Sequence, residues 1–139
     1  MKREDLHSKL PQTKFDVIAA MQLINLEEEE IKLIFPEILF WIADPNWPVA
    51  EYIVPVLLKH PNILLPYLMK HLSEYETDEE FKASIIMLIL PRLSIEMQNQ
   101  VFPYVKRICE NPSETERSRS CDIAQDYLDD VMKRDVKPF

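Results

Sequence analysis

Glycine is absent from the 139-residue sequence, and this absence excludes several kinds of active site. The dinucleotide-binding fingerprint, the Walker loop and the nucleophile elbow all need glycine for a tight turn or for close approach of the backbone to a ligand. None of these motifs can therefore be present. Glycine is also the usual residue in the left-handed position at the end of a helix. Helices in this chain must end by other means, and eleven prolines are available for that purpose.

Histidine is scarce, which argues against the common metal and nucleophile sites. The three histidines are His7, His60 and His71. The last two bracket a predicted helix of about eleven residues, so they lie about 16 Å apart at a rise of 1.5 Å per residue, too far to share a zinc ion within that helix. No His-Glu-x-x-His motif occurs, and no serine is paired with a histidine in a way that suggests a nucleophile. We therefore predict no catalytic residue, no metal ligand and no cofactor-binding residue.

Only two cysteines are present, Cys109 and Cys121. Because no secretory signal precedes them, two reduced thiols are the simpler interpretation, with a disulfide or redox pair as the alternative. Spacing along the chain does not decide whether the two side chains approach each other.

Long apolar runs are also missing. The longest, at residues 83–91, is far shorter than the roughly 20 apolar residues that cross a bilayer, and the N-terminus lacks the apolar core of a signal peptide. We expect a soluble, cytoplasmic protein without membrane contact. Its formal net charge of −8 opposes binding to nucleic acid or anionic membranes and would suit a basic partner, although solubility alone explains such a charge.

The residues that are present predict an all-α fold. Hydrophobic residues make up 47% of the chain and recur at intervals of three and four, with no sustained alternation of the kind that marks strands. Residues 13–26 are expected to form a helix that Thr13 caps. Its apolar face would carry Phe15, Ile18, Ala19 and Met21 or Gln22.

Three prolines divide the rest of the chain into similar units. Apolar residues at helical spacing surround each of three prolines, Pro36, Pro66 and Pro103. Each proline therefore either starts a helix or kinks one that began upstream. A polar turn with a candidate helix cap follows each proline after 10, 11 and 10 residues. The caps are Asn46, Thr77 with Glu80, and Ser113 with Glu116, the last two pairs having the spacing of a capping box.

Each cap is expected to begin a second helix, over residues 47–59, 78–90 and 114–132. Helix pairs that repeat every 30 to 40 residues are typical of an α-solenoid, in which stacked pairs bury a continuous core. We therefore predict a short α-solenoid of about three helix pairs with an extra N-terminal helix. It would occupy residues 13–132 as a single domain, between a flexible N-terminus at residues 1–12 and a frayed tail at residues 133–139.

The segment "DPNWPVAEYIVPVLL" resembles the turn of a HEAT repeat. Asp44 and Pro45 begin the turn and Val49 takes the apolar position, while Ala50 stands where that family usually has arginine. Lys82 and Arg117 take the arginine position in the next two units, so the ladder of contacts between repeats is expected to be incomplete. Residues 14–132 as a whole resemble an uncharacterised bacterial family of small HEAT-like domains that shares an Asp-x-Asn-Trp-Pro-Val-Ala turn.

Five residues in two turns are candidates for a partner-binding site or for a structural role in the turns: Asp44, Asn46, Trp47, Glu76 and Asp78. Trp47 is either an exposed aromatic anchor or a ring packed over its turn, because both roles suit a tryptophan followed by proline. Trp41 lies on an apolar stripe and is expected in the core. Glu76 and Asp78 belong to the acidic segment "SEYETDEEF", which either contacts a basic protein or caps a helix in solvent.

The function predicted from these features is non-catalytic protein binding. The partner would be a protein, with a basic one as the best match to the charge, that is neutralised as an immunity protein neutralises its toxin or held on a scaffold. The alternative is a HEAT-like nucleic-acid-binding protein or a DNA glycosylase-like enzyme, which would need basic residues aligned on a concave face. The basic residues are scattered instead, and one local group stands out: Lys106, Arg107, Arg117 and Arg119.

Overall fold

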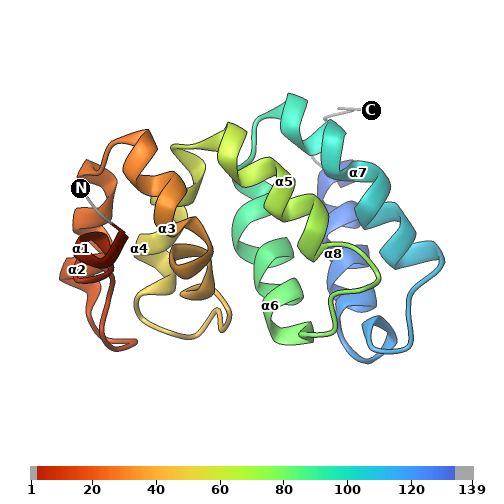
Figure 1. The fold of residues 1–139 in the computed structure, drawn as a ribbon. Helices are drawn as coiled ribbons and strands as arrows, with labels where there is room; N and C mark the ends of the chain where they lie inside the picture. The colour runs from red at the N-terminus through yellow and green to blue at the C-terminus, as the bar shows by residue number, and fades with distance from the viewer. Residues whose placement is uncertain (1–2, 134–139) are drawn as a thin grey trace. The chain divides into compact units, whose positions relative to one another are not determined.

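The computed structural model describes residues 3–133, and these residues are helical with no β-strand (Figure 1). The all-α prediction is confirmed for this part of the chain. The predicted tail at residues 133–139 lies outside it, apart from Lys133. The α-helices are α1 (Arg3–His7), α2 (Val17–Gln22), α3 (Glu28–Phe40), α4 (Ala50–Leu58), α5 (Pro61–His71), α6 (Glu79–Ser84), α7 (Ile95–Glu110) and α8 (Ser120–Lys133). Four shorter helical turns accompany them: η1 (Leu23–Asn25), η2 (Ile85–Ile89), η3 (Leu90–Arg92) and η4 (Glu116–Ser118).

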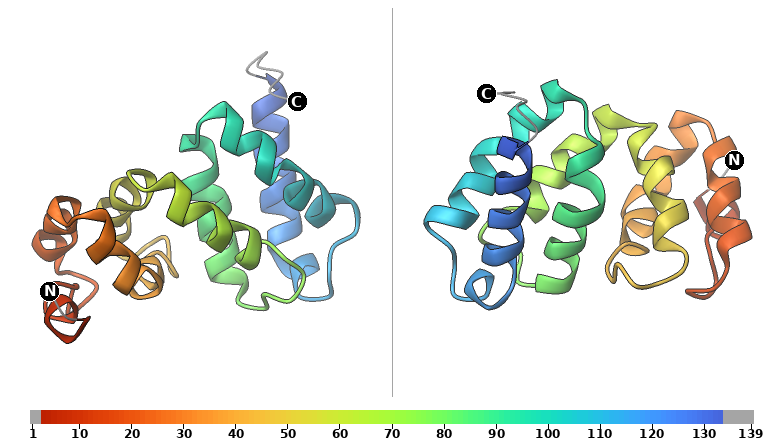
Figure 2. Two further views of the ribbon diagram at one scale, coloured as in Figure 1. Left: turned by 45° about the horizontal axis from the view of Figure 1, so that its top comes forward. Right: turned by 180° about the vertical axis from the view of Figure 1, so that it is seen from behind.

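The chain divides into two compact units, where the sequence predicted one domain. The N-terminal unit is Met1–Leu64 and the C-terminal unit is Leu65–Phe139, so the boundary falls within α5. In the N-terminal unit α1 packs on α3, α2 packs on α4, and α3 and α4 contact each other. In the C-terminal unit α6 and α7 both pack against α8, and α6 and α8 run side by side in the views of Figure 2.

Residues 3–12 differ from the expected flexible segment. Helix α1 packs against α3, Leu6 is fully buried, and Leu10 is 8% exposed. Leu6 and Leu10 lie four positions apart, which is the spacing that puts two side chains on one face of a helical turn. Burial of these two leucines provides the free energy that holds this segment against α3.

Helix α2 is shorter than predicted and presents a different face to the core. Its N-cap is Asp16, whose side chain accepts a hydrogen bond from the Ala19 N–H, so the assignment of Thr13 as the cap is wrong. The predicted apolar face points mainly to solvent, and its exposed members are Phe15 (66%), Ile18 (66%) and Met21 (52%). The buried positions are Ala20 and Leu23. The spacing of apolar residues predicts that a helix has an apolar face, but it does not show which face packs against another helix.

Pro36, Pro66 and Pro103 all lie inside helices, so the alternative in which they start helices is wrong. Helix α3 begins eight residues before Pro36, and Ile34 within it departs from helical geometry, with φ −127° and ψ 16°. Proline lacks an N–H and its ring clashes with the preceding turn, which explains a kink at this place. Pro61, by contrast, is the first residue of α5, where the missing N–H costs nothing.

Capping and proline also shape α6. The carboxylate of Asp78 accepts from the Phe81 N–H at 3.1 Å, so Asp78, and not Thr77, is the N-cap. The predicted helix over residues 78–90 is not regular to its end. Its last turns are the π-helical turn η2 and the 3₁₀ turn η3. Pro91 stands in η3 and cannot continue an α-helical hydrogen-bond ladder, which accounts for the change.

Candidate functional site

The turn at residues 44–49 is held by its own polar groups. An Asp44 carboxylate oxygen accepts a hydrogen bond from the Asn46 N–H at 2.8 Å, and the Asp44 carbonyl accepts from the Trp47 N–H at 3.1 Å. The Val49 N–H donates to the carbonyl of Lys14, which ties this turn to the segment before α2. Asp44 is half-buried and Asn46 is exposed. The main local role of Asp44 is therefore to shape the turn that carries Trp47.

Three aromatic rings meet beside this turn, and we call Phe40, Trp41 and Trp47 the aromatic cluster. The Phe40 and Trp41 ring centroids lie 5.3 Å apart, and the Trp47 centroid lies 5.6 Å from each of them. Trp47 is half-buried, so it is packed over the turn and also reaches the surface. Trp41 is half-buried as well, and its predicted place in the core is wrong. Phe40 is 54% exposed.

The outer face of α3 continues the apolar surface of the aromatic cluster. The inner face of the helix is fully buried through Ile31, Ile34, Phe35 and Ile38. Leu33 and Phe40 nevertheless remain 45% and 54% exposed, the first before and the second after the kink at Ile34. A helix on the surface of a unit normally carries polar residues on its outer face. Large apolar side chains exposed together on a soluble protein often mark an interaction surface.

A groove of about 570 Å³ borders the aromatic cluster in the N-terminal unit. We call it the aromatic groove, and it lies between the segment after α1 and the outer side of α3. At one side Glu37 Oε1 lies 3.4 Å from His7 Nε2, and both side chains are partly exposed. The full lining is His7, Leu10, Pro11, Gln12, Pro36, Glu37, Phe40 and Trp41. The groove thus combines aromatic and proline walls with one carboxylate.

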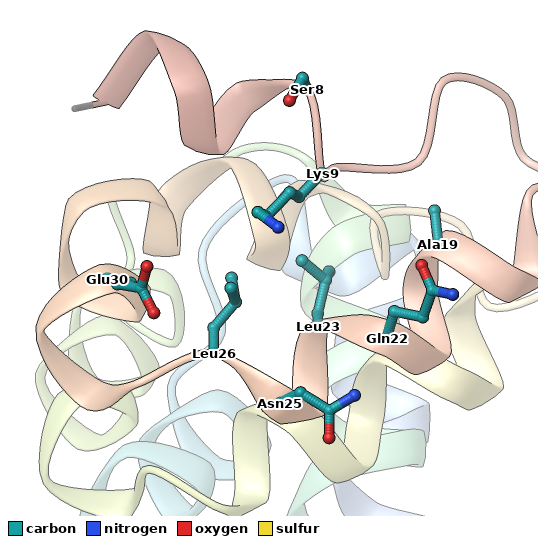
Figure 3. Close-up of a pocket in the computed structure, with 8 residues that line it drawn as sticks. All are labelled: Ser8, Lys9, Ala19, Gln22, Leu23, Asn25, Leu26 and Glu30. Carbon is teal, nitrogen blue, oxygen red and sulfur yellow. The ribbon is translucent and has the colours of Figure 1, made fainter. Parts of the chain in front are cut away.

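A second cavity of the N-terminal unit has a more polar lining and a volume of about 560 Å³. Figure 3 shows the Lys9 side chain reaching into the space that Leu23, Leu26 and Glu30 border. Glu30 is already engaged, because its Oε1 accepts from the Glu27 N–H at 2.9 Å in the cap of α3. Lys9 is therefore the charged side chain of this cavity that could bind a ligand, because Glu30 is already used in the cap of α3.

Glu76 and Asp78, the predicted candidates of the second turn, are held in local contacts. Glu76 Oε1 lies 2.6 Å from His71 Nδ1, and Glu76 Oε2 accepts from the Asp78 N–H at 3.2 Å. The His71 ring in turn packs edge-on against Phe81. Both acids thus order the connection from α5 to α6. Tyr75, beside them, is 85% exposed.

The C-terminal unit contains a buried ion network that the sequence analysis did not assemble. Glu116 is fully buried, and its Oε2 accepts from Lys82 Nζ at 2.6 Å and from Arg107 Nη2 at 2.7 Å. Lys82 is also fully buried, and its Nζ donates to the Ser73 carbonyl at 2.9 Å. Arg107 Nη2 donates to the Leu72 carbonyl at 3.0 Å. The network therefore joins α6, α7, η4 and the residues that directly follow α5.

Hydrogen bonding favours the charged forms of Glu116 and Arg107. Burial by itself would raise the pKa of Glu116, but hydrogen bonds from Arg107, Lys82 and the Ser113 N–H lower it to about 2. The hydrogen bond to Glu116 raises the pKa of Arg107. Because Glu116 is held by hydrogen bonds from three donors, the network suits structural support better than proton transfer.

One sequence signal did point to part of this network. The predicted capping box is present, because Glu116 Oε1 accepts from the Ser113 N–H at 2.8 Å and the Glu116 N–H donates to Ser113 Oγ at 3.3 Å. It lies in the turn that leads into η4, however, and α8 begins only at Ser120, so the prediction that it begins the helix at 114–132 is wrong. The predicted local basic group does not form a free patch. Arg107 serves the network, Lys106 Nζ lies 3.8 Å from Glu110, and Arg119 Nε lies 3.0 Å from Glu80.

Both cysteines are free thiols. Burial, followed by the influence of Cys121, raises the pKa of the Cys109 thiol to about 11. His60 is 7% exposed, and burial together with Lys59 lowers its pKa, whereas Glu28 opposes this shift. Among residues 3–133, no three His, Cys, Asp or Glu side chains gather as a metal site requires. Over the same residues, no helix has the length and apolar character to cross a membrane.

Residues 9–128 match the family model described as a domain of unknown function, DUF5071. The chain belongs to this family. The match includes residues of both units, so the DUF5071 domain extends from the segment after α1 into α8. It contains the aromatic cluster and the buried ion network. No curated protein matches the chain.

Proposed function

We propose that this DUF5071 domain is a HEAT-like helical-repeat module that binds a basic protein through the outer face of α3 and the aromatic cluster. The observation that carries the proposal is the exposure of large apolar side chains on a helix whose opposite face is fully buried. Leu33 and Phe40 remain 45% and 54% exposed, and the apolar surface that each leaves in water costs free energy. Covering them with a partner would remove that cost.

The composition of this surface favours a protein partner. Tryptophan is enriched among residues that dominate binding free energy, and two tryptophans lie beside the exposed Phe40. Carboxylates are interleaved with the apolar residues, since Glu37 lies in the aromatic groove and Asp44 shapes the adjoining turn. A partner with apolar anchors and basic residues would match both features.

The net charge of −8 supports a basic partner and speeds its approach at low ionic strength. A neutralising role against a basic protein or a scaffolding role, in the cytoplasm, would use the same surface. The nucleic-acid alternative has less support, because Arg107 and Arg119 already contact carboxylates. A phosphate backbone would have to compete with those contacts.

The proposal is tested by capture from native-host extract with the tagged protein and two variants. Phe40→Ser removes the exposed ring of the aromatic cluster. Tyr75→Ser is the matched control, because it removes a ring that is 85% exposed in the C-terminal unit. We expect one protein to be retained by the wild type and by Tyr75→Ser, and to be lost with Phe40→Ser while circular dichroism shows an intact fold.

Equal retention of that protein by Phe40→Ser would contradict the proposed surface. A mobility-shift assay with duplex DNA and RNA at low salt tests the alternative. We expect no retardation, and binding that falls steeply with added salt would favour the nucleic-acid function instead.

A further inference from the structure

We propose that the aromatic groove binds a proline-rich segment of the partner in the polyproline II conformation. Prolines of the segment would pack against Phe40 and Pro36, and the indole N–H of Trp41 would donate a hydrogen bond to one of its backbone carbonyls. This inference rests on the proposed protein-binding function and adds to it the composition and conformation of the bound segment.

The walls of the aromatic groove suit an apolar ligand. Five of the eight residues that line it are apolar: Leu10, Pro11, Pro36, Phe40 and Trp41. Phe40 is 54% exposed, so its ring offers accessible surface to a ligand. The volume of about 570 Å³ lies within the range of about 300 to 1,000 Å³ that small ligands occupy, which suits a short stretch of extended chain. Proline-rich segments dock in grooves with aromatic walls of this kind.

The charged side chains of the lining are engaged with each other. Glu37 Oε1 lies 3.4 Å from His7 Nε2, and both His7 Nε2 and Glu37 Oε2 are buried. This pair connects α1 to α3 and forms one wall of the groove. A bound segment therefore meets a surface without a presented charge, and proline, which is uncharged, matches it. The net charge of −8 favours basic residues on either side of the prolines.

The groove presents one hydrogen-bond donor, the indole N–H of Trp41. Trp41 is half-buried, and within residues 3–133 its Nε1 has no hydrogen-bond acceptor. The buried polar atoms that lack a partner do not include it, so this N–H faces water. An indole N–H can only donate, and the matching group on a ligand is an acceptor such as a backbone carbonyl. A ligand that covered the donor without an acceptor would bind poorly, because a buried unpaired donor is costly.

Among the regular backbone conformations, polyproline II meets both requirements. An added β-strand needs the edge of a sheet, and residues 3–133 contain no strand. A helix uses its carbonyls in its own hydrogen bonds, apart from those of its last turn. A polyproline II segment has no internal hydrogen bonds, so each of its carbonyls can accept from Trp41. It also loses little conformational freedom on binding, because proline already restricts the free chain.

The test uses the whole protein and three amidated peptides that carry fluorescein at the N-terminus and one arginine each. The first is Ala-Pro-Pro-Ala-Pro-Pro-Ala-Arg, and the second has alanine in place of every proline. The third is an amphipathic helix of leucine and glutamine. Fluorescence anisotropy measures the affinities. We expect submillimolar binding of the proline peptide and at least about tenfold weaker binding of the other two.

Two-dimensional NMR of the indole N–H signals locates the site, with Trp41 assigned through Trp41→Phe. The proline peptide should shift the Trp41 signal and slow the exchange of its N–H with water, because the proton enters a hydrogen bond. An unchanged Trp41 signal, or an unchanged exchange rate, would contradict the proposed hydrogen bond.

The variant Trp41→Phe keeps an aromatic ring in the groove and removes the donor. It should weaken binding of the proline peptide about fivefold, which is the loss expected for one hydrogen bond. Tyr75→Phe is the matched control, because it removes a hydroxyl from a ring that is 85% exposed in the C-terminal unit. The control should change the affinity by less than about twofold. If circular dichroism shows that Trp41→Phe does not fold, the exchange rate of the Trp41 N–H in the wild type decides the same question.

Equal binding of the alanine peptide or of the helical peptide would overturn this inference, as would an unchanged affinity in a folded Trp41→Phe. None of these results would end the broader proposal if extract capture still depends on Phe40. Conversely, binding of the proline peptide without any Phe40-dependent protein partner would leave the peptide site in place and remove the proposed function. The two failures are therefore distinguishable.

Discussion

Lys82 and Glu116 form an ion pair inside the C-terminal unit, with Nζ and Oε2 2.6 Å apart and both side chains fully buried. Thirty-four positions separate them along the chain. Two charges taken out of water are costly unless each finds partners, and here Arg107, Ser73 and Ser113 complete the set. The pair therefore joins α6 to the segment that leads into α8.

Replacing Glu116 with glutamine should destabilise the C-terminal unit strongly. The substitution removes the closer counter-charge of the buried Lys82 and leaves Glu79 Oε2 at 4.0 Å, and breaking a buried pair in this way costs about 3 to 5 kcal/mol. Urea unfolding followed by circular dichroism measures the change. Glu114→Gln, on an exposed side chain, should stay within about 0.5 kcal/mol. A loss below about 1 kcal/mol for Glu116→Gln would mean that Lys82 finds another partner or water.

Stability should fall in acid through Glu116. Its folded pKa is about 2, below the ordinary value of 4.5. A depressed pKa stabilises the folded state above pH 4.5, and this stabilisation is lost as the pH falls from 4.5 toward 2. The difference in the free energy of unfolding between the wild type and Glu116→Gln should therefore narrow by about 1.4 kcal/mol per pH unit as the pH falls over that range. A constant gap would refute the pairing.

His60 should make the fold sensitive to mild acid. Burial lowers its pKa below 6.5, Lys59 adds to the shift, and Glu28 opposes it. The neutral ring is then favoured in the folded state, so stability is complete above pH 6.5 and declines as the pH falls below that value. Thermal unfolding of the wild type and of His60→Gln between pH 7.5 and 5 tests this. The unfolding temperature should decline less steeply with falling pH in His60→Gln than in the wild type. Parallel curves of unfolding temperature against pH would contradict a role for His60.

Asp78 and Thr77 give a direct comparison of the two possible caps of α6. Asp78→Ala removes the acceptor of the Phe81 N–H and should cost about 1 kcal/mol. Thr77→Ala should change stability by less than about 0.5 kcal/mol, because Thr77 is exposed and Asp78 supplies the cap. Equal effects in urea unfolding would restore Thr77 as a cap.

Cys109 should react slowly with alkylating reagents while the protein is folded. Its pKa of about 11 leaves little thiolate at pH 8, and the thiolate is the reactive form. Labelling with iodoacetamide at pH 8 should be about a hundredfold slower in buffer than in urea, as read from the peptide that contains Cys109 by mass spectrometry. Similar rates in both solvents would show that the thiol is not shielded.

Local features were predictable where neighbours in sequence supply the partner. Apolar spacing and the lack of strand-like alternation led correctly to an all-α fold over the described residues. The reciprocal bonds of Ser113 and Glu116 were also predicted, since both groups lie within one turn. The capping of α6 was missed by one residue, because Thr77 and Asp78 are both good caps and sequence does not rank them at this position.

Features that depend on distant neighbours were not predictable. Trp41, Phe15 and Ile18 were all assigned to buried faces, but Trp41 is only half-buried and Phe15 and Ile18 are exposed. Periodicity identifies an apolar side of a helix but contains no information about which side a second helix covers. The aromatic groove was missed for the same reason, because it combines residues 7–12 with α3.

The sequence by itself determined that this chain is helical, acidic and without any glycine-dependent nucleotide site, since these properties follow from composition and local spacing. The packing of α1 on α3, the exposure of Phe40 and the meeting of Lys82, Arg107 and Glu116 were decided only by the tertiary structure. Those features depend on contacts between segments far apart in the chain. The free energy of such contacts comes from burial and pairing that no single segment contains.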